Sequence, residues 1–112
     1  MSDDTKPSPS DVLYVATSYD DGTATIVLVG EFDMSGAAHF WASVGEALEM
    51  RPPSIVVEAR GVTFIDSSGI AALIRAHEAA NQAGVAFRVR EPSPMLRRMA
   101  ELTGVTHLLP DE

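Results

Sequence analysis

Apolar side chains gather in two short runs near the start of the chain, with a polar segment between them. Two β-rich runs, residues 12–17 and 23–29, flank Asp20-Asp21-Gly22, and an Asp-Gly pair between such runs is a strong signal for a β-hairpin. The preceding residues, 1–10, are polar and include two prolines, with too few apolar side chains to offset the entropy lost on ordering. We therefore expect a flexible tail over 1–10 and one folded domain over 11–112 that opens with this hairpin.

The pattern changes to a helical period after the hairpin. Ser35 is a candidate N-cap, and Pro52-Pro53 would stop the helix. Between them apolar side chains recur at helical spacing, at Phe40, Val44, Ala47 and Leu48. Residues 55–59 then form a β-branched run that is too short for a stable helix, which predicts a buried central strand.

A second transition from strand to helix follows. Residues 62–65 lead into Asp66-Ser67-Ser68-Gly69, and the helix that starts there ends near Gly84. One face of this helix is marked by Ile70, Leu73, Ile74 and His77. Residues 85–90 alternate apolar with polar side chains in their second half, which predicts a strand close to an edge of the sheet.

The last predicted elements are a helix and a short strand. Ser93-Pro94 combines an N-cap with proline at the first helical position, and the helix runs to Thr103-Gly104. Its apolar face is assigned to Met95, Leu96, Met99 and Leu102. Residues 107–109 would add a final strand. The order of elements predicts an α/β fold: a mixed, mostly parallel sheet of four to five strands with an N-terminal hairpin, packed against helices.

Composition narrows the possible functions. The 112 residues are 46% hydrophobic, enough for one modest core, and include no cysteine, which excludes disulfides, thiolate nucleophiles and Cys-ligated zinc. The formal net charge of -8 argues against direct nucleic-acid binding, which relies on clustered Lys and Arg. Because the sequence shows neither a signal peptide nor a membrane-spanning run, we expect a cytoplasmic protein that does not bind a membrane.

The segment Asp66-Ser67-Ser68-Gly69 lies where the chain leaves the sheet and starts a helix. Free backbone N–H groups and the helix dipole favour a negative group there, so a phosphate on serine would not unfold the domain. Its charge of about -1.5 to -2 would instead be felt by a binding partner. The alternative is structural: Asp66 or Ser67 caps the helix, Ser68 fills the first turn, and Gly69 permits close packing.

Residues 64–70 resemble the signature of the STAS domains, specifically of the bacterial anti-sigma factor antagonists. Further stretches resemble the family at matching places: Gly30-Glu31-Phe32-Asp33, residues 55–59, and residues 92–94 with 96–102. The resemblance spans about residues 12–109, nearly the whole chain. One departure is Phe32, where the family has leucine, a conservative apolar change.

The resemblance implies a STAS-like fold and a protein-binding switch. Ser67, the first serine after the aspartate, would be phosphorylated by a partner kinase, and the surrounding partner surface would include Asp33, Asp66, Ser68 and Gly69. The implied partner is an anti-sigma factor of the GHKL-type serine kinase class, bound while Ser67 is unphosphorylated so that a sigma factor is released. A phosphatase would reset the serine. The chain itself would be no enzyme and would need no metal ion or other cofactor.

Other functions find less support in the sequence. Ser67 has no recognisable histidine partner for nucleophilic catalysis, and Glu31, Asp33 and Asp66 would have to converge to bind magnesium. The histidines lie on different elements, without the i, i+4 spacing of a metal site: His39, His77 and His107. The alternative that remains open is a constitutive STAS interaction scaffold, a subunit of a larger signalling or transport assembly, in which Ser67 is only a helix cap.

Overall fold

The computed structural model describes residues 13–109, and the predicted tail over 1–10 lies outside this range. Four strands form one sheet in the order β1-β2-β3-β4. Their bounds are β1 Leu13–Asp20, β2 Thr23–Phe32, β3 Ser54–Ile65 and β4 Ala86–Arg90. β1 pairs with β2 antiparallel, while β2 with β3 and β3 with β4 are parallel. The predicted hairpin and the mostly parallel sheet are both confirmed.

The turn between β1 and β2 follows from its sequence. Asp20 pairs with Thr23, so the two-residue loop is Asp21-Gly22. Both loop residues have positive φ, 56° and 81°, as a hairpin turn that matches the twist of its strands requires. Glycine adopts this conformation freely and aspartate tolerates it, which explains the strength of the Asp-Gly signal.

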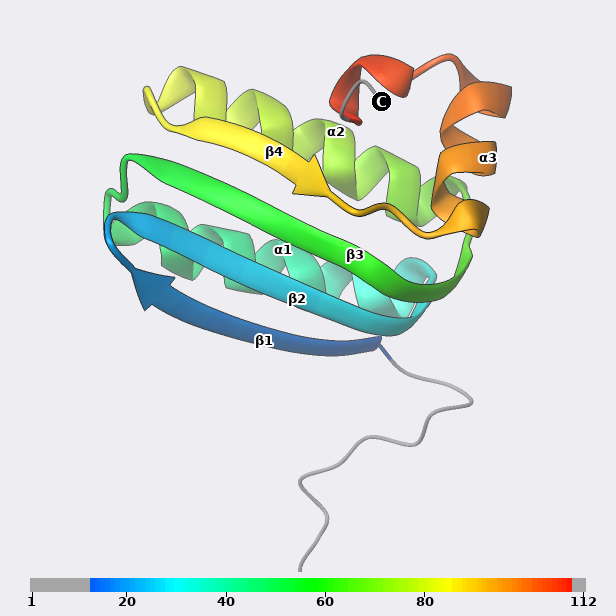
Figure 1. The fold of residues 1–112 in the computed structure, drawn as a ribbon, viewed down its shortest axis with the longest axis horizontal. Helices are drawn as coiled ribbons and strands as arrows, with labels where there is room; N and C mark the ends of the chain where they lie inside the picture. Colours follow the sequence, from blue (N-terminus) through cyan, green and yellow to red (C-terminus); the bar gives the residue numbers. More distant parts are fainter. Residues whose placement is uncertain (1–12, 110–112) are drawn as a thin grey trace, which may run out of the picture.

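Three helices and one short 3-10 turn complete the described chain. Their bounds are α1 Met34–Glu49, α2 Ser67–Gln82, α3 Pro94–Thr103 and η2 Thr106–Leu108. Figure 1 shows α1 and α2 behind the sheet, so these helices cover one face, and α3 at the end where β3 and β4 finish. Within residues 13–109, none of the helices combines the length and the apolar character that crossing a membrane requires.

The core lies between the sheet and the two covering helices. Alternate residues of β2 are buried on the helix side, among them Ile26, Leu28 and Phe32. The ring of Phe32 meets that of Phe40 from α1 edge to face, with centroids 5.3 Å apart. Val56 of β3 is also buried although it belongs to the other face, which fits the prediction of a buried central strand.

Two predictions near the C-terminus are wrong. Residues 106–108 form the 3-10 turn η2 and not a strand, because Leu108 and Leu109 are both buried there and the turn packs on the helix layer, against α2 and α3. The predicted apolar face of α3 is correct at Leu96 and at Met99, which packs against the core, but wrong at Met95 and Leu102, which are exposed. Only Leu96 and Ala100, four residues apart, are buried in this helix.

The predicted strand pieces around Ala59 belong to one element. Residues 55–59 and 62–65 were separated by Arg60-Gly61 in the sequence pattern, yet β3 runs unbroken through both. The pairing of β3 with β2 shifts register near Gly61, so the strand continues through this point with an irregularity.

Candidate functional site

Two helices begin side by side at one end of the sheet, where the parallel strands finish. The neighbouring parallel strands β2 and β3 end on the paired residues Phe32 and Ile65. The backbone N–H of Asp66 donates to the carbonyl oxygen of Phe32 at 3.4 Å, which holds the two chain ends together. Each strand then passes through one aspartate into a helix, α1 after Asp33 and α2 after Asp66. The positive ends of both helix dipoles therefore face the same region.

Both aspartates are N-caps. Oδ1 of Asp66 accepts hydrogen bonds from the backbone N–H groups of Ser68, at 2.9 Å, and Gly69, at 3.3 Å. Oδ1 of Asp33 accepts one, from Gly36 at 3.0 Å. The prediction that Ser35 caps the first helix is therefore wrong. The extended backbone at Asp33 puts its carboxylate within reach of the free N–H groups, and Ser35 already lies inside the helix.

The two helix starts repeat one short pattern, Asp-X-Ser-Gly. It reads Asp33-Met34-Ser35-Gly36 before α1 and Asp66-Ser67-Ser68-Gly69 before α2. In both copies the aspartate is half-buried, the next residue is exposed and the glycine is buried. The repeat places Met34 and Ser67 at equivalent positions, each the first residue of its helix.

Close packing explains the glycine that ends each copy. A Cβ atom on Gly69 would lie 2.5 Å from the carbonyl oxygen of Phe32 and 2.7 Å from Cγ1 of Ile65. On Gly36 it would lie 2.8 Å from the carbonyl oxygen of Glu31. Any side chain would push the first helical turn off the strand ends. Gly69 is buried, so it does not form part of the exposed surface itself. It can affect a partner surface only by allowing the first turn of α2 to lie close to the strand ends.

Ser67 is the exposed member of the predicted site. Asp66 and Ser68 on either side of it are half-buried, and so is Asp33 on the neighbouring helix start. The structure thus brings together all the residues predicted for partner binding. The Ser67 hydroxyl lies at the start of α2, where the positive end of the helix dipole favours an added negative charge, while the N–H groups of Ser68 and Gly69 are already bonded to Asp66.

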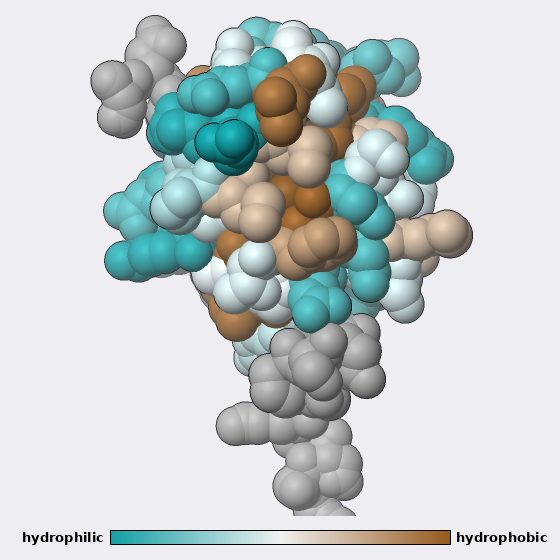
Figure 2. Space-filling view, turned by 90° about the vertical axis from the view of Figure 1, so that its right-hand side faces the viewer, coloured by the Kyte–Doolittle hydropathy of each residue, from teal (hydrophilic) through white to brown (hydrophobic). Residues whose placement is uncertain are grey.

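Exposed apolar side chains gather at the same end of the molecule. Figure 2 looks onto the end where the parallel strands finish and shows apolar surface in its middle, with polar surface around it. Exposed large apolar residues lie on several elements that begin or finish there, and we use the name apolar patch for four of them: Met34 of α1, Phe64 of β3, and Met95 and Leu102 of α3. Apolar side chains that are grouped on a surface are typical of protein-binding sites.

The sequence pattern did not reveal this patch. Met34 was missed because the helix was predicted to start at Ser35, and Phe64 because the sequence pattern over residues 62–65 did not predict which side chains are exposed. The register of β3 supplies the missing information: Phe64 pairs with Glu31, which places it on the face of the sheet that the helices leave open.

Other candidate chemistry is not assembled in the described residues. Among residues 13–109, no three His, Cys, Asp or Glu side chains come together as metal ligands would. The ring of His77 packs edge to face against Phe87, with centroids 5.9 Å apart, and against His107, at 6.2 Å. Arg75 lies over the ring of Trp41, 4.7 Å from its centroid, so these aromatic groups serve packing between elements.

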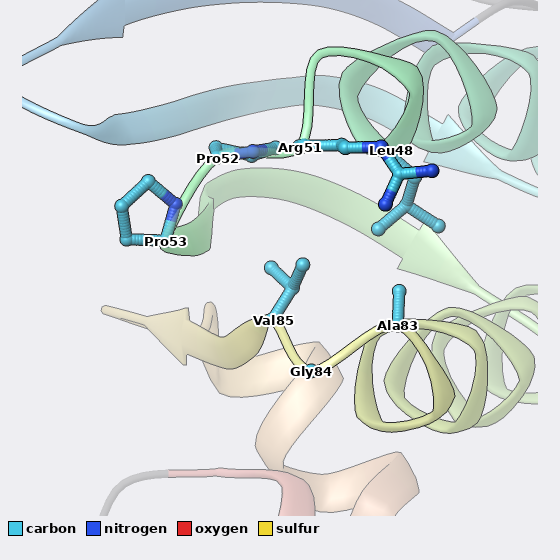
Figure 3. Close-up of a pocket in the computed structure, with 7 residues that line it drawn as sticks. All are labelled: Leu48, Arg51, Pro52, Pro53, Ala83, Gly84 and Val85. Atoms are coloured by element: carbon cyan, nitrogen blue, oxygen red, sulfur yellow. The ribbon is translucent and has the colours of Figure 1, made fainter.

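A groove of about 320 Å³ lies at the opposite end of the molecule (Figure 3). It separates the last turns of α1 and α2, and its lining is Leu48, Arg51, Pro52, Pro53, Ala83, Gly84 and Val85. Arg51 is its one charged residue. Arg51 follows the end of α1, where the helix dipole favours a cation.

A family model and several known proteins match this chain over most of its length. A family model described as "Mlab, STAS domain" matches residues 15–110. An anti-sigma F factor antagonist of Paenibacillus polymyxa is 24% identical over 99 residues, covering 88% of this chain and 85% of the relative. The anti-sigma-F factor antagonist RsfB of Mycobacterium tuberculosis is 29% identical over 98 residues, covering 88% of this chain and 80% of RsfB.

Solved structures share the fold. The anti-sigma factor antagonist SpoIIAA in its unphosphorylated form superposes with a TM-score of 0.76 at 20% identity, covering 88% of each chain. The Bacillus cell fate determinant SpoIIAA in its phosphorylated form gives a TM-score of 0.70, also at 20% identity, and covers 88% of this chain and 91% of that chain.

Proposed function

Because this chain belongs to the STAS domain family, whose model covers residues 15–110, we propose that it is an anti-sigma factor antagonist switched off by phosphorylation of Ser67. Unphosphorylated, the chain binds an anti-sigma factor and thereby releases a sigma factor for transcription. The names of its relatives in Paenibacillus and Mycobacterium support the first part of this proposal.

One observation carries the switch: Ser67 is exposed at the first position of α2, beside two acidic caps and within a surface that includes the apolar patch. A phosphate there adds a charge of about -1.5 to -2 to a surface that a partner must desolvate. The nearby carboxylates of Asp33 and Asp66 accept hydrogen bonds from backbone N–H groups. They are themselves negative, so they do not neutralise the charge of the phosphate. Binding is therefore weakened while the fold is kept.

The partner in this proposal is an anti-sigma factor of the GHKL-type serine kinase class, which transfers the γ-phosphoryl group of ATP to the Ser67 hydroxyl. A phosphatase removes the phosphate by hydrolysis and restores binding. The chain is the substrate of both reactions. The positive end of the α2 dipole favours the negative charge of the phosphate on Ser67. Asp66 and Ser68 belong to the contact surface because they flank the modified serine.

Affinity measurements on Ser67 variants test this function. In calorimetry with the anti-sigma factor, Ser67→Ala should bind as the wild type does, and it should stay bound when ATP is added. Ser67→Asp should raise the Kd at least about tenfold, or about 1.4 kcal/mol, because one carboxylate carries part of the charge of a phosphate.

A charge control separates the site from the overall charge. Ala42 is exposed in the middle of α1, away from the helix start, so Ala42→Asp adds the same charge elsewhere. It should change the Kd less than about twofold. Equal affinities for Ser67→Ala and Ser67→Asp would refute the switch and favour a constitutive scaffold.

A further inference from the structure

The strand β1 forms one edge of the sheet, and no other described strand pairs with its outer side. It is eight residues long, and its pairing with β2 runs without a register shift from Leu13 to Asp20. It contains no lysine, arginine or proline, and Asp20 at its very end is its one charged residue. Natural proteins usually guard edge strands with such residues or with bulges, so β1 is open to pairing with another strand.

The opposite edge of the sheet is guarded. β4 has only five residues, of which Arg88 and Arg90 are exposed. The guanidinium of Arg90 forms an ion pair with Glu58 of β3 at 2.7 Å, which fixes one charge near this edge. A short strand with exposed arginines is a common defence against edge pairing. The contrast between the two edges is therefore built into the sequence.

We propose that β1 is a self-association edge, at which two copies of this chain pair their β1 strands antiparallel to form a continuous eight-stranded sheet. A two-fold axis normal to the sheet relates the copies and keeps the helices of both on the same face. The occupant is a second copy because the strand suits its own antiparallel image in side-chain pairing and in charge.

The side-chain pairing can be read from the strand. With Thr17 on the axis, Tyr19 of one copy lies opposite Val15 of the other, an aromatic and β-branched pair of the kind that stabilises sheets. Tyr14 and Tyr19, which are 43% and 50% exposed, then both gain a neighbour across the new boundary. Asp20 lies opposite Tyr14, so the two aspartates do not meet.

The overall charge sets the conditions under which the pair forms. Each chain carries a formal charge of -8, so two copies repel each other at low ionic strength. Salt screens this repulsion and leaves the backbone hydrogen bonds and the aromatic contacts of the strand pair. Association should therefore strengthen as salt is added, the reverse of an interface made by ion pairs.

Pairing at β1 leaves the Ser67 end free. β2 runs antiparallel to β1, so an antiparallel pair of β1 strands points the β2 strands of the two copies in opposite directions. The two Ser67 sites then lie at opposite ends of the dimer, and each remains open to its own partner. The proposal does not depend on the proposed function, since self-association can be measured without any anti-sigma factor.

Single cysteines give the most direct test, because the natural chain has none. Residues that face each other across an antiparallel pair have Cα atoms about 4.5 to 5.5 Å apart, within the range of a disulfide. Ala16→Cys, Thr17→Cys and Ser18→Cys should be oxidised in turn with oxidised glutathione. The variant whose cysteine lies on the axis should form a covalent dimer in high yield, and Ala86→Cys on β4 should not.

Sedimentation equilibrium supplies the second measurement. Wild-type protein should pass from monomer to dimer as its concentration and the salt concentration rise. Ala16→Lys with Ser18→Lys puts lysines opposite each other and should raise the dimer Kd at least about tenfold. Gln82→Lys with Ala86→Lys adds the same two charges at exposed positions away from β1 and should keep the dimer.

Two results would overturn the proposal. One is a monomer at every protein and salt concentration together with no covalent dimer from any of the three β1 cysteines. The other is a dimer that the β1 lysines leave unchanged. Circular dichroism of each variant shows whether a loss of dimer comes from unfolding.

Discussion

Gly69 shows how a single residue fixes the site. The first turn of α2 crosses the end of β2 so closely that a Cβ atom would lie 2.5 Å from a backbone carbonyl oxygen. Because that oxygen belongs to the strand backbone, it cannot move aside as a flexible side chain could. The glycine therefore positions Ser67 by letting the helix start directly at the strand ends.

We expect Gly69→Ala to lower the free energy of unfolding by about 1 to 3 kcal/mol, the usual cost of overpacking. Gly45 is the matched control, since it lies within α1 and a Cβ atom there would meet nothing within 4 Å. Gly45→Ala should raise stability by about 0.5 to 1 kcal/mol through helix propensity. Urea denaturation measures both, and equal effects would contradict the packing argument.

At the scale of the elements, the two helix starts depend on their aspartate caps. Asp66 accepts two backbone hydrogen bonds and Asp33 accepts one. We expect Asp66→Ala to cost about 1 to 2 kcal/mol of stability and Asp33→Ala to cost less, about 0.5 to 1 kcal/mol. Thermal denaturation of the two variants checks this order.

Asparagine variants distinguish capping from charge. Asp66→Asn keeps an oxygen that accepts from the same N–H groups, so its stability should stay close to that of the wild type. Any change in its affinity for the anti-sigma factor then reports on the lost carboxylate. A loss of stability as large as that of Asp66→Ala would show that the geometry of the cap is not what matters.

The order of elements could be read from the sequence because strong local signals mark it. Asp21-Gly22 defines the hairpin, and Ser93-Pro94 starts α3 with the Ser93 hydroxyl accepting from Leu96 N–H as predicted. Local signals did not settle which of two nearby polar residues caps α1. They also could not show that Leu108 and Leu109 pack on the helix layer, since that depends on where the chain lies after Gly104 reverses it.

The site itself was predicted from a motif, and the structure adds its surroundings. Ser67, Asp66 and Asp33 come together because the parallel strands β2 and β3 finish at the same end of the sheet. The apolar patch could not be predicted, because the exposure of Phe64 depends on a shift of register between strands. The role of each residue in binding remains a prediction.

At the scale of the whole molecule, the two ends of the sheet differ in character. The end with Ser67 presents the apolar patch, and the opposite end presents the groove beside Arg51. Met34 and Met50 lie at opposite ends of α1 and are 73% and 65% exposed. They allow the same substitution to be compared at both ends.

We expect Met34→Lys to raise the Kd for the anti-sigma factor at least about tenfold, because it buries a charge in an apolar contact. Met50→Lys should change the Kd less than about twofold. Calorimetry on the two variants tests which end binds. Equal losses would mean that charge alone governs the affinity, and a loss for Met50→Lys only would move the binding site to the other end.

Phosphorylation of Ser67 is the central claim, and intact-mass spectrometry tests it most directly. The purified chain is incubated with ATP and candidate kinases from the same cell, and the modified site is mapped by fragmentation. The account predicts a gain of one phosphate, about 80 Da, on Ser67, and no gain for Ser67→Ala. A phosphate on another residue, or an unmodified chain that still captures its anti-sigma factor in the presence of ATP, would contradict it.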